Sequence, residues 1–445
     1  MRRPSVRHVA TVVGLSVVML SFGAVAGGVG RTQSDPAASS EVVAASPARV
    51  INGGDPTKAA AALQERLRAL PDDWAAWSAL GSLYTSQART SADPSYYGKA
   101  EGAFATSLRL QPHDNLAAIT GQATLAASRH AFGEALQLTQ SVDGKNPYAA
   151  GNLGIMVDAL VELGRYPEAF TALQRMVDLK PGVASYARVS YSYELRGDNA
   201  GAKLALEHAL AVAQSPADAS FAQQYLGELA FNSGDLTTAA QHFAAGLERD
   251  PGYVPLLAGK ARVEAAQGRT SEAITDWQEV TSRLPQPTYL IEYADLLTSL
   301  NRTQEAAVQY ALIEATAKLF RAQGANVDLE LSLFDADNGR APRALSAAQA
   351  QIDQRNSIHV EDAYAWALHA SGRDAEALTH AVSADRLGMK NALFAYHRGM
   401  IEKSLGRNAE AAVSLEKALT INPYFSPVQA PLAKAALDQL KGKAP

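Results

Sequence analysis

A glycine followed five residues later by an alanine recurs through most of the chain. The stretch 160–181 shows the unit, with Gly164, then Ala169 and finally Pro181. Successive units place the alanine at Ala59, Ala100, Ala135, Ala169, Ala202, Ala239, Ala273, Ala306, Ala344, Ala377 and Ala411. These positions are 33 to 38 residues apart, except for a first step of 41. Such a period indicates a stack of repeated helix pairs, because each unit can bury its apolar face against its neighbours.

Each marker in the unit has a physical role that fits two antiparallel helices. The turn position is occupied by Gly164, Gly197, Gly234, Gly268, Asn301, Gly339, Gly372 and Gly406. Gly and Asn readily accept the left-handed conformation that ends a helix. The alanine permits close helix approach, and four residues later a larger side chain such as Phe104, Phe243 or Trp277 shares its face. The chain is rich in Ala and Leu, which favours an all-α fold.

The pattern resembles the tetratricopeptide repeat. The residues that carry the resemblance are Trp77, Leu80, Gly81, Tyr84, Ala100, Phe104 and Pro112 in one copy and Leu226, Gly227, Gly234, Ala239, Phe243 and Pro251 in another. It implies a right-handed superhelical solenoid of about ten helix hairpins over residues 57–423. The closing proline is missing after the hairpins centred on Ala202, Ala306, Ala344 and Ala377. Residues 424–445 are expected to form a capping helix and tail, because 431–441 has one apolar and one charged face.

The N-terminus has the composition of an export segment. Arg2, Arg3 and Arg7 precede a run without charges over residues 9–30, and Ala24-Val25-Ala26 matches a signal-peptidase site. Two interpretations stay open for residues 1–30: a cleaved signal peptide, or an uncleaved anchor whose apolar run is long enough to span a bilayer. Residues 31–56 have no helical period and are expected to be a flexible linker. Either interpretation predicts an exported protein, extracellular or in the cell envelope.

Composition and motif searches give no indication of catalysis. The chain has no cysteine, so disulfides, thiolate metal sites and a cysteine nucleophile are excluded. Its net charge of −5 argues against nucleic acid as a partner. It contains no glycine-rich nucleotide loop, zinc-protease motif or serine-hydrolase elbow. We therefore expect no cofactor, no metal and no catalytic residues, and a membrane contact only through residues 9–30 if they are retained.

The resemblance implies that the first helix of each hairpin lines a concave groove. In the predicted helix 358–370, His359, Asp362, Trp366 and His369 are spaced 3, 4 and 3 residues apart and share one face, with Tyr396 nearby on the next hairpin. The corresponding groove positions on other hairpins include Asp158, Tyr191, Phe221, Glu228, Asp295 and Asp337. These residues form either a solvated polar and aromatic wall, or a binding groove. A mildly acidic groove with aromatic side chains would favour a neutral or basic peptide.

Three functions fit these features. The first is an extracytoplasmic scaffold that binds another protein in the concave groove. The second is a regulatory or substrate-recruiting arm of an envelope enzyme complex, of the glycosyltransferase or cytochrome-maturation type, with catalysis in a partner. The third is a structural role in envelope assembly.

Overall fold

The computed structural model describes residues 56–442, and in this part of the chain it contains α-helices, one short 3-10 helix and no strand. The α-helices are α2 (Pro56–Ala69), α3 (Trp74–Ser91), α4 (Ser95–Leu110), α5 (Leu116–Ser128), α6 (Phe132–Asp143), α7 (Ala150–Glu162), α8 (Tyr166–Leu179), α9 (Val183–Leu195), α10 (Asn199–Ala211), α11 (Pro216–Asn232), α12 (Leu236–Arg249), α13 (Val254–Ala266), α14 (Thr270–Arg283), α15 (Pro287–Ser299), α16 (Thr303–Ala322), α17 (Asp328–Asp337), α18 (Ala341–Ile352), α19 (Ile358–Ala370), α20 (Asp374–Ala384), α21 (Ala392–Ser404), α22 (Asn408–Ile421) and α23 (Gln429–Leu440). The predicted export segment and linker lie outside the described residues.

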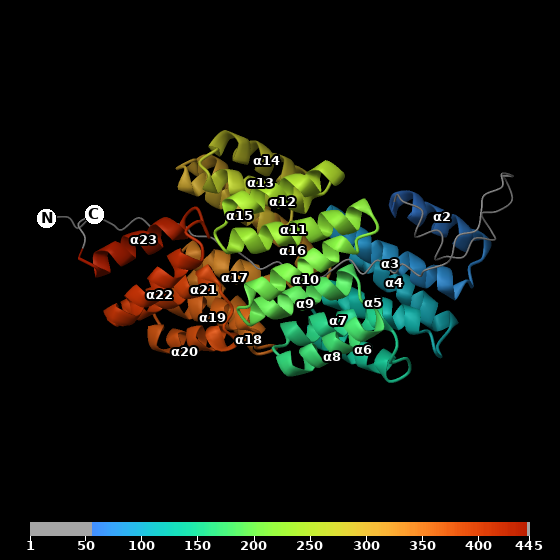
Figure 1. Ribbon diagram of the computed structural model, residues 1–445. Coiled ribbons are helices and arrows are strands. Elements are labelled where there is room, and N and C mark those ends of the chain that lie inside the picture. Colours follow the sequence, from blue (N-terminus) through green and yellow to red (C-terminus); the bar gives the residue numbers. More distant parts are fainter. Residues whose placement is uncertain (1–55, 443–445) are drawn as a thin grey trace.

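The helices pair into ten antiparallel hairpins, from α3 with α4 to α21 with α22 (Figure 1). Helix α2 precedes them as a half-repeat, and α23 covers the last hairpin by packing on α22 and α21. This arrangement confirms the predicted all-α solenoid with a terminal capping helix. No helix among the described residues is both long and apolar enough to cross a membrane.

The turn and crossing residues behave as the repeat pattern predicts. All eight turn residues have positive φ angles, from 58° at Asn301 to 79° at Gly234. The repeated alanines are buried, because each lies where the second helix of a hairpin crosses the first. The wider spacing before Ala344 is accommodated by α16, which extends to 20 residues.

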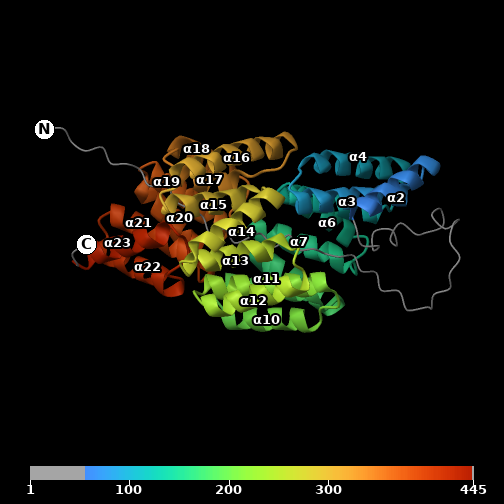
Figure 2. The same ribbon diagram turned by 90° about the horizontal axis from the view of Figure 1, so that it is seen from above.

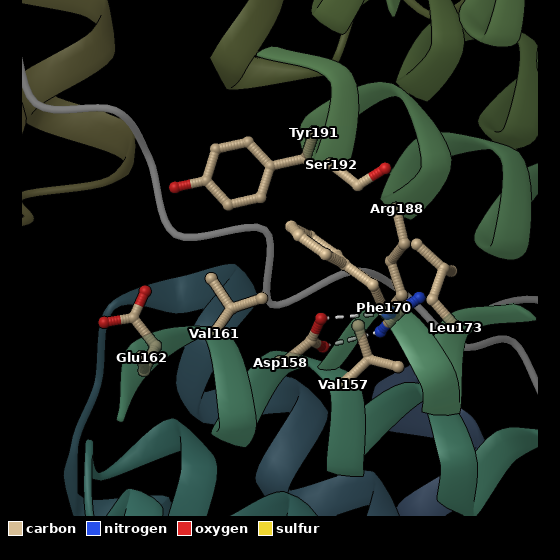
Figure 3. Close-up of a pocket in the computed structure, with 9 residues that line it drawn as sticks. All are labelled: Val157, Asp158, Val161, Glu162, Phe170, Leu173, Arg188, Tyr191 and Ser192. Atoms are coloured by element: carbon tan, nitrogen blue, oxygen red, sulfur yellow. Dashed lines mark hydrogen bonds and ion pairs between the residues drawn. The ribbon is translucent and has the colours of Figure 1, made fainter. Parts of the chain in front are cut away.

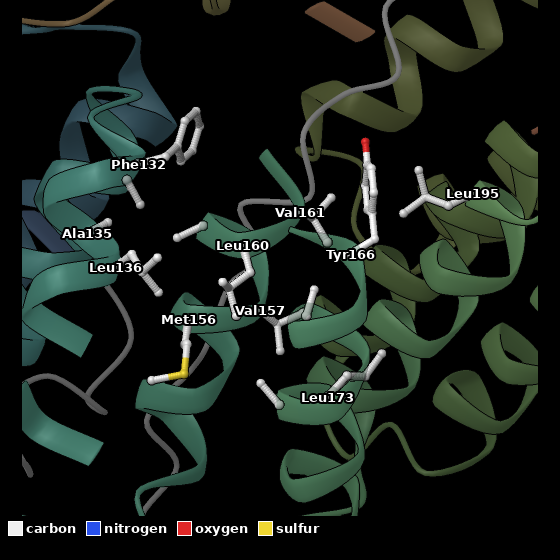
Figure 4. Packing of buried hydrophobic residues seen from close by; sticks show 14 of the residues in the cluster. Phe132, Ala135, Leu136, Met156, Val157, Leu160, Val161, Tyr166, Leu173 and Leu195 are labelled. Atoms are coloured by element: carbon white, nitrogen blue, oxygen red, sulfur yellow. The ribbon is translucent and has the colours of Figure 1, made fainter. Parts of the chain in front are cut away.

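The large residue four positions after the alanine joins each hairpin to the next one. A Cβ atom built on Gly227 would lie 2.4 Å from the Phe243 ring, and one built on Gly259 would lie 2.3 Å from the same ring. Gly227 belongs to the same hairpin as Phe243, whereas Gly259 belongs to the following one. The ring therefore fills a space that only two glycines leave open. Figure 4 shows the apolar packing around Leu160 and Leu173, which belong to one buried cluster.

The superhelix is wound so tightly that its two halves touch. The end of α16 lies beside α4 (Figure 2), and the backbone amide of Asn326 donates to the carbonyl oxygen of Arg129 over 2.9 Å. We call the seam the set of contacts between residues 89–234 and residues 286–425. The hydrogen bonds and ion pair with the largest separations join residues 191 to 197 positions apart.

The seam combines polar bonds with apolar packing. Arg355 forms a buried ion pair with Glu162, and the hydroxyl of Tyr166 accepts a hydrogen bond of 2.8 Å from the backbone amide of Ile358. The Ile358 side chain is buried in the same apolar cluster as Leu160. The groove is therefore enclosed by contact between the two halves, a feature absent from the sequence-based expectation.

Turn glycines of the first half also form part of the seam. A Cβ atom on Gly197 would lie 2.3 Å from the carbonyl oxygen of Gly388, and one on Gly164 would lie 2.8 Å from the carbonyl oxygen of Asn356. By contrast, a Cβ atom on Gly268 would meet nothing within 4 Å, although its φ of 75° is almost the same as the 74° of Gly197. Position 197 therefore requires glycine for two reasons: the turn needs a positive φ angle, and the backbone of the other half lies too close for a side chain.

Candidate functional site

The concave side of the solenoid, called here the inner surface, is built from the first helix of successive hairpins. Eleven residues of this surface were predicted from the sequence as groove residues: Asp158, Tyr191, Phe221, Glu228, Asp295, Asp337, His359, Asp362, Trp366, His369 and Tyr396. The expectation that these side chains are solvated without a partner is wrong for the buried ones, which are Phe221, Asp295, Asp337, Asp362, Trp366 and Tyr396. The other five are partly buried.

Asp158 lies beside a small cavity between α7, α8 and α9 (Figure 3). Its carboxylate accepts two hydrogen bonds from Arg188, 2.6 Å from Nη2 and 2.8 Å from Nε. Burial raises the pKa of Asp158, and Arg188 opposes this shift. The cavity measures about 20 Å³ and is also lined by Glu162 and Tyr191. That volume holds about one water molecule, so the cavity by itself is too small for a ligand.

A charged triad continues the inner surface on α11, α13 and α15. Arg262 lies between Glu228, with which it forms an ion pair, and Glu292, whose Oε2 is 2.8 Å from Arg262 Nε. Burial raises the pKa of Glu292 to about 7, while Arg262 opposes the shift and Glu228 adds to it. One guanidinium therefore pairs with two carboxyl groups, so acidic groups outnumber basic ones in this part of the surface.

Glu194 differs from these acids because no basic side chain among the described residues forms an ion pair with it. Burial and the charge of Glu228 raise the pKa of Glu194 to about 7. Its carboxyl lines a cavity of about 50 Å³ between α9–α11 and the loops that precede α21 and α23. The cavity also contains the side chains of Asn232, Asn391 and Phe425. Both sides of the seam thus contribute to the surroundings of Glu194.

Two buried aspartates of the predicted set, Asp295 and Asp337, lie on α15 and α17. Asp337 accepts a hydrogen bond of 2.6 Å from the indole Nε1 of Trp366. Neither carboxylate oxygen of Asp295 has a hydrogen-bond partner within the described part of the protein. Burial raises the pKa of both groups well above the usual range of a carboxyl, and their proximity to each other raises the pKa of Asp295 further. Burial therefore favours the neutral form of Asp295 over the ionised form.

The predicted face of α19 separates into three unlike environments. Asp362 and the buried His397 of α21 form a pair of 2.9 Å, and the His397 ring stacks on Trp366 with centroids 4.1 Å apart. His369 instead lies 2.5 Å from Asp374 of α20. His359 reaches across the seam, with its Nε2 3.0 Å from the hydroxyl of Tyr191. Burial and Arg355 lower the pKa of His359 to about 4, so its ring is neutral.

Sequence reasoning missed Arg188, Arg355 and His397 as members of this surface. For His397 a signal existed, because it lies 35 residues after Asp362, one repeat further along. Arg188 follows Asp158 by 30 residues, which is a looser match to the period. For Arg355 there was none, because its partner Glu162 is 193 residues away. In the described residues no three His, Asp or Glu side chains converge to hold a metal ion.

The arrangement offers binding chemistry. It presents carboxylates in partly buried positions, interleaved with the partly buried rings of Tyr191 and Tyr225. No serine, threonine or lysine nucleophile is placed against the Asp362–His397 pair by any hydrogen bond in the described residues. The surface therefore suits recognition of an uncharged or cationic segment.

Comparisons with known proteins agree with the repeat architecture. Family models of the tetratricopeptide repeat match residues 259–319 and 394–425. A relative, the cellulose synthase 1 operon protein C of Komagataeibacter xylinus, is 26% identical over 267 residues, which are 57% of this chain and 19% of that protein. The chain therefore spans about a fifth of that relative's length.

Two solved structures are similar to the chain at low sequence identity. A thermophilic tetratricopeptide-repeat protein of Thermus thermophilus is 22% identical, with a TM-score of 0.35 over 38% of this chain and 91% of its own. The Cut9–Hcn1 hetero-tetramer of the APC/C gives 14% identity and a TM-score of 0.43 over 89% of this chain and 85% of the matched chain. Residues 259–319 and 394–425 therefore carry tetratricopeptide repeats, a fold suited to protein–protein interaction.

Proposed function

We propose that the protein binds a segment of another protein on the inner surface, at the stretch formed by Tyr191, Glu194, Tyr225 and Glu228. The single observation behind this choice is Glu194, an inner carboxyl that forms no ion pair with a basic side chain of the described residues, although Lys390 lines the same cavity. Most of the residues predicted downstream, from Asp295 to Tyr396, already have internal partners or are buried. Their role in binding stays a prediction, and we assign the first contact to the partly buried stretch.

A basic side chain is the expected anchor of the partner segment. A lysine or arginine placed beside Glu194 would favour its ionised form and offset the repulsion from Glu228. A hydrogen bond to a charged group contributes roughly 1.5–3 kcal/mol, which corresponds to about 10- to 150-fold in affinity. The rings of Tyr191 and Tyr225 supply apolar contact area at low entropic cost.

Site-specific photocrosslinking tests this proposal. A benzophenone amino acid at position 225 should form adducts with the partner in intact cells, because Tyr225 lies on the inner surface. The matched control is position 148, since Tyr148 is 78% exposed on the outside. Glu194→Gln should reduce the adduct yield about tenfold or more, whereas Glu248→Gln, an exposed acid of α12, should leave it unchanged. Equal yields from positions 225 and 148 would contradict the proposal.

A second candidate is the recruiting arm of an envelope enzyme complex, with catalysis in the partner. It is favoured by the similarity to a protein named for a cellulose synthase operon. On this account, the adduct from position 225 contains a subunit of a polysaccharide-synthesising complex. Adducts made only of proteins outside such complexes would leave the general scaffold as the better description.

The site of action is proposed to be outside the cytoplasm. This proposal is supported by Arg2, Arg3 and Arg7, by the uncharged run 9–30 and by the Ala24-Val25-Ala26 site. Mass spectrometry of the mature N-terminus distinguishes the two forms, because cleavage leaves a chain that starts at Gly27. A chain found in the cytoplasm with Met1 retained would refute export.

A further inference from the structure

We infer that the seam is a clasp that must open to admit the partner segment to the inner surface. This inference rests on the proposed function, and it concerns how the binding surface is reached. It follows from the residues that the seam and the surface share, and from the kind of contact that closes the seam.

The same side chains line the inner cavity and hold the two halves together. Glu162 and Tyr191 both line the cavity beside Asp158. Glu162 is paired across the seam with Arg355, and Tyr191 across the seam with His359. A partner that takes contacts from these two residues must therefore compete with Arg355 and His359. Binding and seam closure are mutually exclusive at these positions.

The cavity beside Glu194 gives a second link between surface and seam. One wall comes from the first half, through Glu194 and Leu229, and the other from the second half, through Met389 and Asn391. At about 50 Å³ it is too small for a lysine or arginine side chain as it stands. Access to Glu194 from this side requires the two walls to separate.

The contacts across the seam are of a kind that can part without unfolding the hairpins. Helix pairs with extensive contact are all close in sequence, so no helix of the first half packs lengthwise on one of the second. The halves meet through loops, through single polar side chains such as the Asn422 amide that donates to the Phe231 carbonyl over 2.8 Å, and through one apolar cluster in which Ile358, Met389 and Phe394 pack on the first half. A solenoid can bend elastically through small rotations between repeats, because each hairpin contacts mainly its neighbours.

The absence of cysteine allows the seam to be locked selectively. We would replace Arg165 and Gln354 by cysteine, because these exposed residues lie on opposite sides of the seam beside the Gly164–Asn356 contact, and join them with a short bifunctional reagent that forms a disulfide with each thiol. Capture through the crosslinker at position 225 should fall at least tenfold in the joined protein and return on reduction. Capture that is equal in the joined and reduced forms would overturn the clasp while leaving the proposed function intact. If the protein without the added cysteines also failed to capture a partner through position 225, the proposed function itself would be contradicted.

A second measurement needs no partner and no disulfide. Ser192→Cys places a single thiol at the cavity beside Asp158, and its rate of reaction with a bulky maleimide reports opening. Adding Tyr166→Phe or Arg355→Gln loosens the seam and should accelerate labelling several-fold. Arg340→Gln is the control, because Arg340 pairs with Glu314 and Asp335 on its own side of the seam.

Loss of the whole fold is distinguished by a thiol inside a hairpin. Ser220→Cys serves for this, because Ser220 is buried between α11 and α12 and bonds to the Gly246 carbonyl. The clasp predicts that seam variants accelerate labelling at position 192 and leave it unchanged at position 220. No acceleration at 192, or equal acceleration at both positions, would overturn the inference.

Discussion

Gly197→Ala should weaken the seam more than the same change at any turn that faces solvent. The new methyl group would have to occupy a point 2.3 Å from the carbonyl oxygen of Gly388. This oxygen belongs to the backbone, so a rotamer change cannot relieve the clash. Gly268→Ala is the matched control, because it has the same left-handed φ but meets open space.

The two substitutions share one cost and differ in another. An alanine in the left-handed region costs roughly 1–2 kcal/mol at either position. Overpacking against a fixed neighbour adds about 1–3 kcal/mol at position 197 alone. If the halves separate to relieve the clash, the overpacking cost lowers the free energy needed to open the seam. The open form then becomes about 5- to 150-fold more populated.

Hydrogen exchange measures that difference locally. The amide of Ile358 is protected by the hydroxyl of Tyr166 across the seam, and peptides over 354–360 and 386–392 should exchange faster in Gly197→Ala by the stated factor. The same peptides should be unchanged in Gly268→Ala, where only the 264–272 turn exchanges faster. Identical exchange patterns in the two variants would refute the seam as a stabilising contact.

Three further predictions concern the core and the inner acids. Burial and Glu228 raise the pKa of Glu194 from the usual value of about 4.5 to about 7 in the folded protein. Between these values the folded protein keeps a proton that the unfolded chain has lost, so the free energy of unfolding should fall by up to roughly 3 kcal/mol as pH rises through this interval. Glu194→Gln should flatten that part of the melting-temperature profile between pH 4.5 and 7, and an unchanged slope would contradict the assignment. Arg262→Gln leaves the Glu292 carboxylate uncompensated and should cost about 3–5 kcal/mol at pH 8 but less at pH 5, where Glu292, with a pKa of about 7, is protonated. Urea denaturation measures this cost, and a cost independent of pH would argue against the Arg262–Glu292 pair. Phe243→Ala should cost about 3–5 kcal/mol, and Phe243→Leu clearly less; equal melting temperatures for the two would contradict the role of the ring.

The local fold was predictable because each repeat solves the same packing problem. Gly164, Ala169 and Phe243 make their contacts within one or two hairpins. Because such residues recur about every 34 positions, their roles can be recognised in the sequence. The pair Glu228–Arg262, 34 residues apart, follows the same logic, because equivalent positions on adjacent first helices are neighbours. Charge partners within the stack can thus be found by stepping one period along the chain.

The seam was not predictable by that route. The two halves meet because small rotations between successive hairpins add up over more than five repeats. No single residue indicates how large the total rotation becomes. Glu162 and Arg355 carry no mark of their pairing across 193 residues. Asp337 is buried within the second half, where it accepts a hydrogen bond from Trp366 of the next hairpin, so a face that looks solvated in the sequence is covered in the structure.

The contact between the two halves is tested most directly by a distance across the seam in solution. Spin labels on cysteines at Arg165 and Gln354, exposed positions beside the Gly164–Asn356 contact, can be measured by pulsed electron resonance in the otherwise cysteine-free chain. The structure predicts a single short and narrow distance distribution in the protein alone, with a longer population appearing when the partner is bound. A long, broad distribution in the free protein, as expected of an open solenoid, would contradict the closed superhelix.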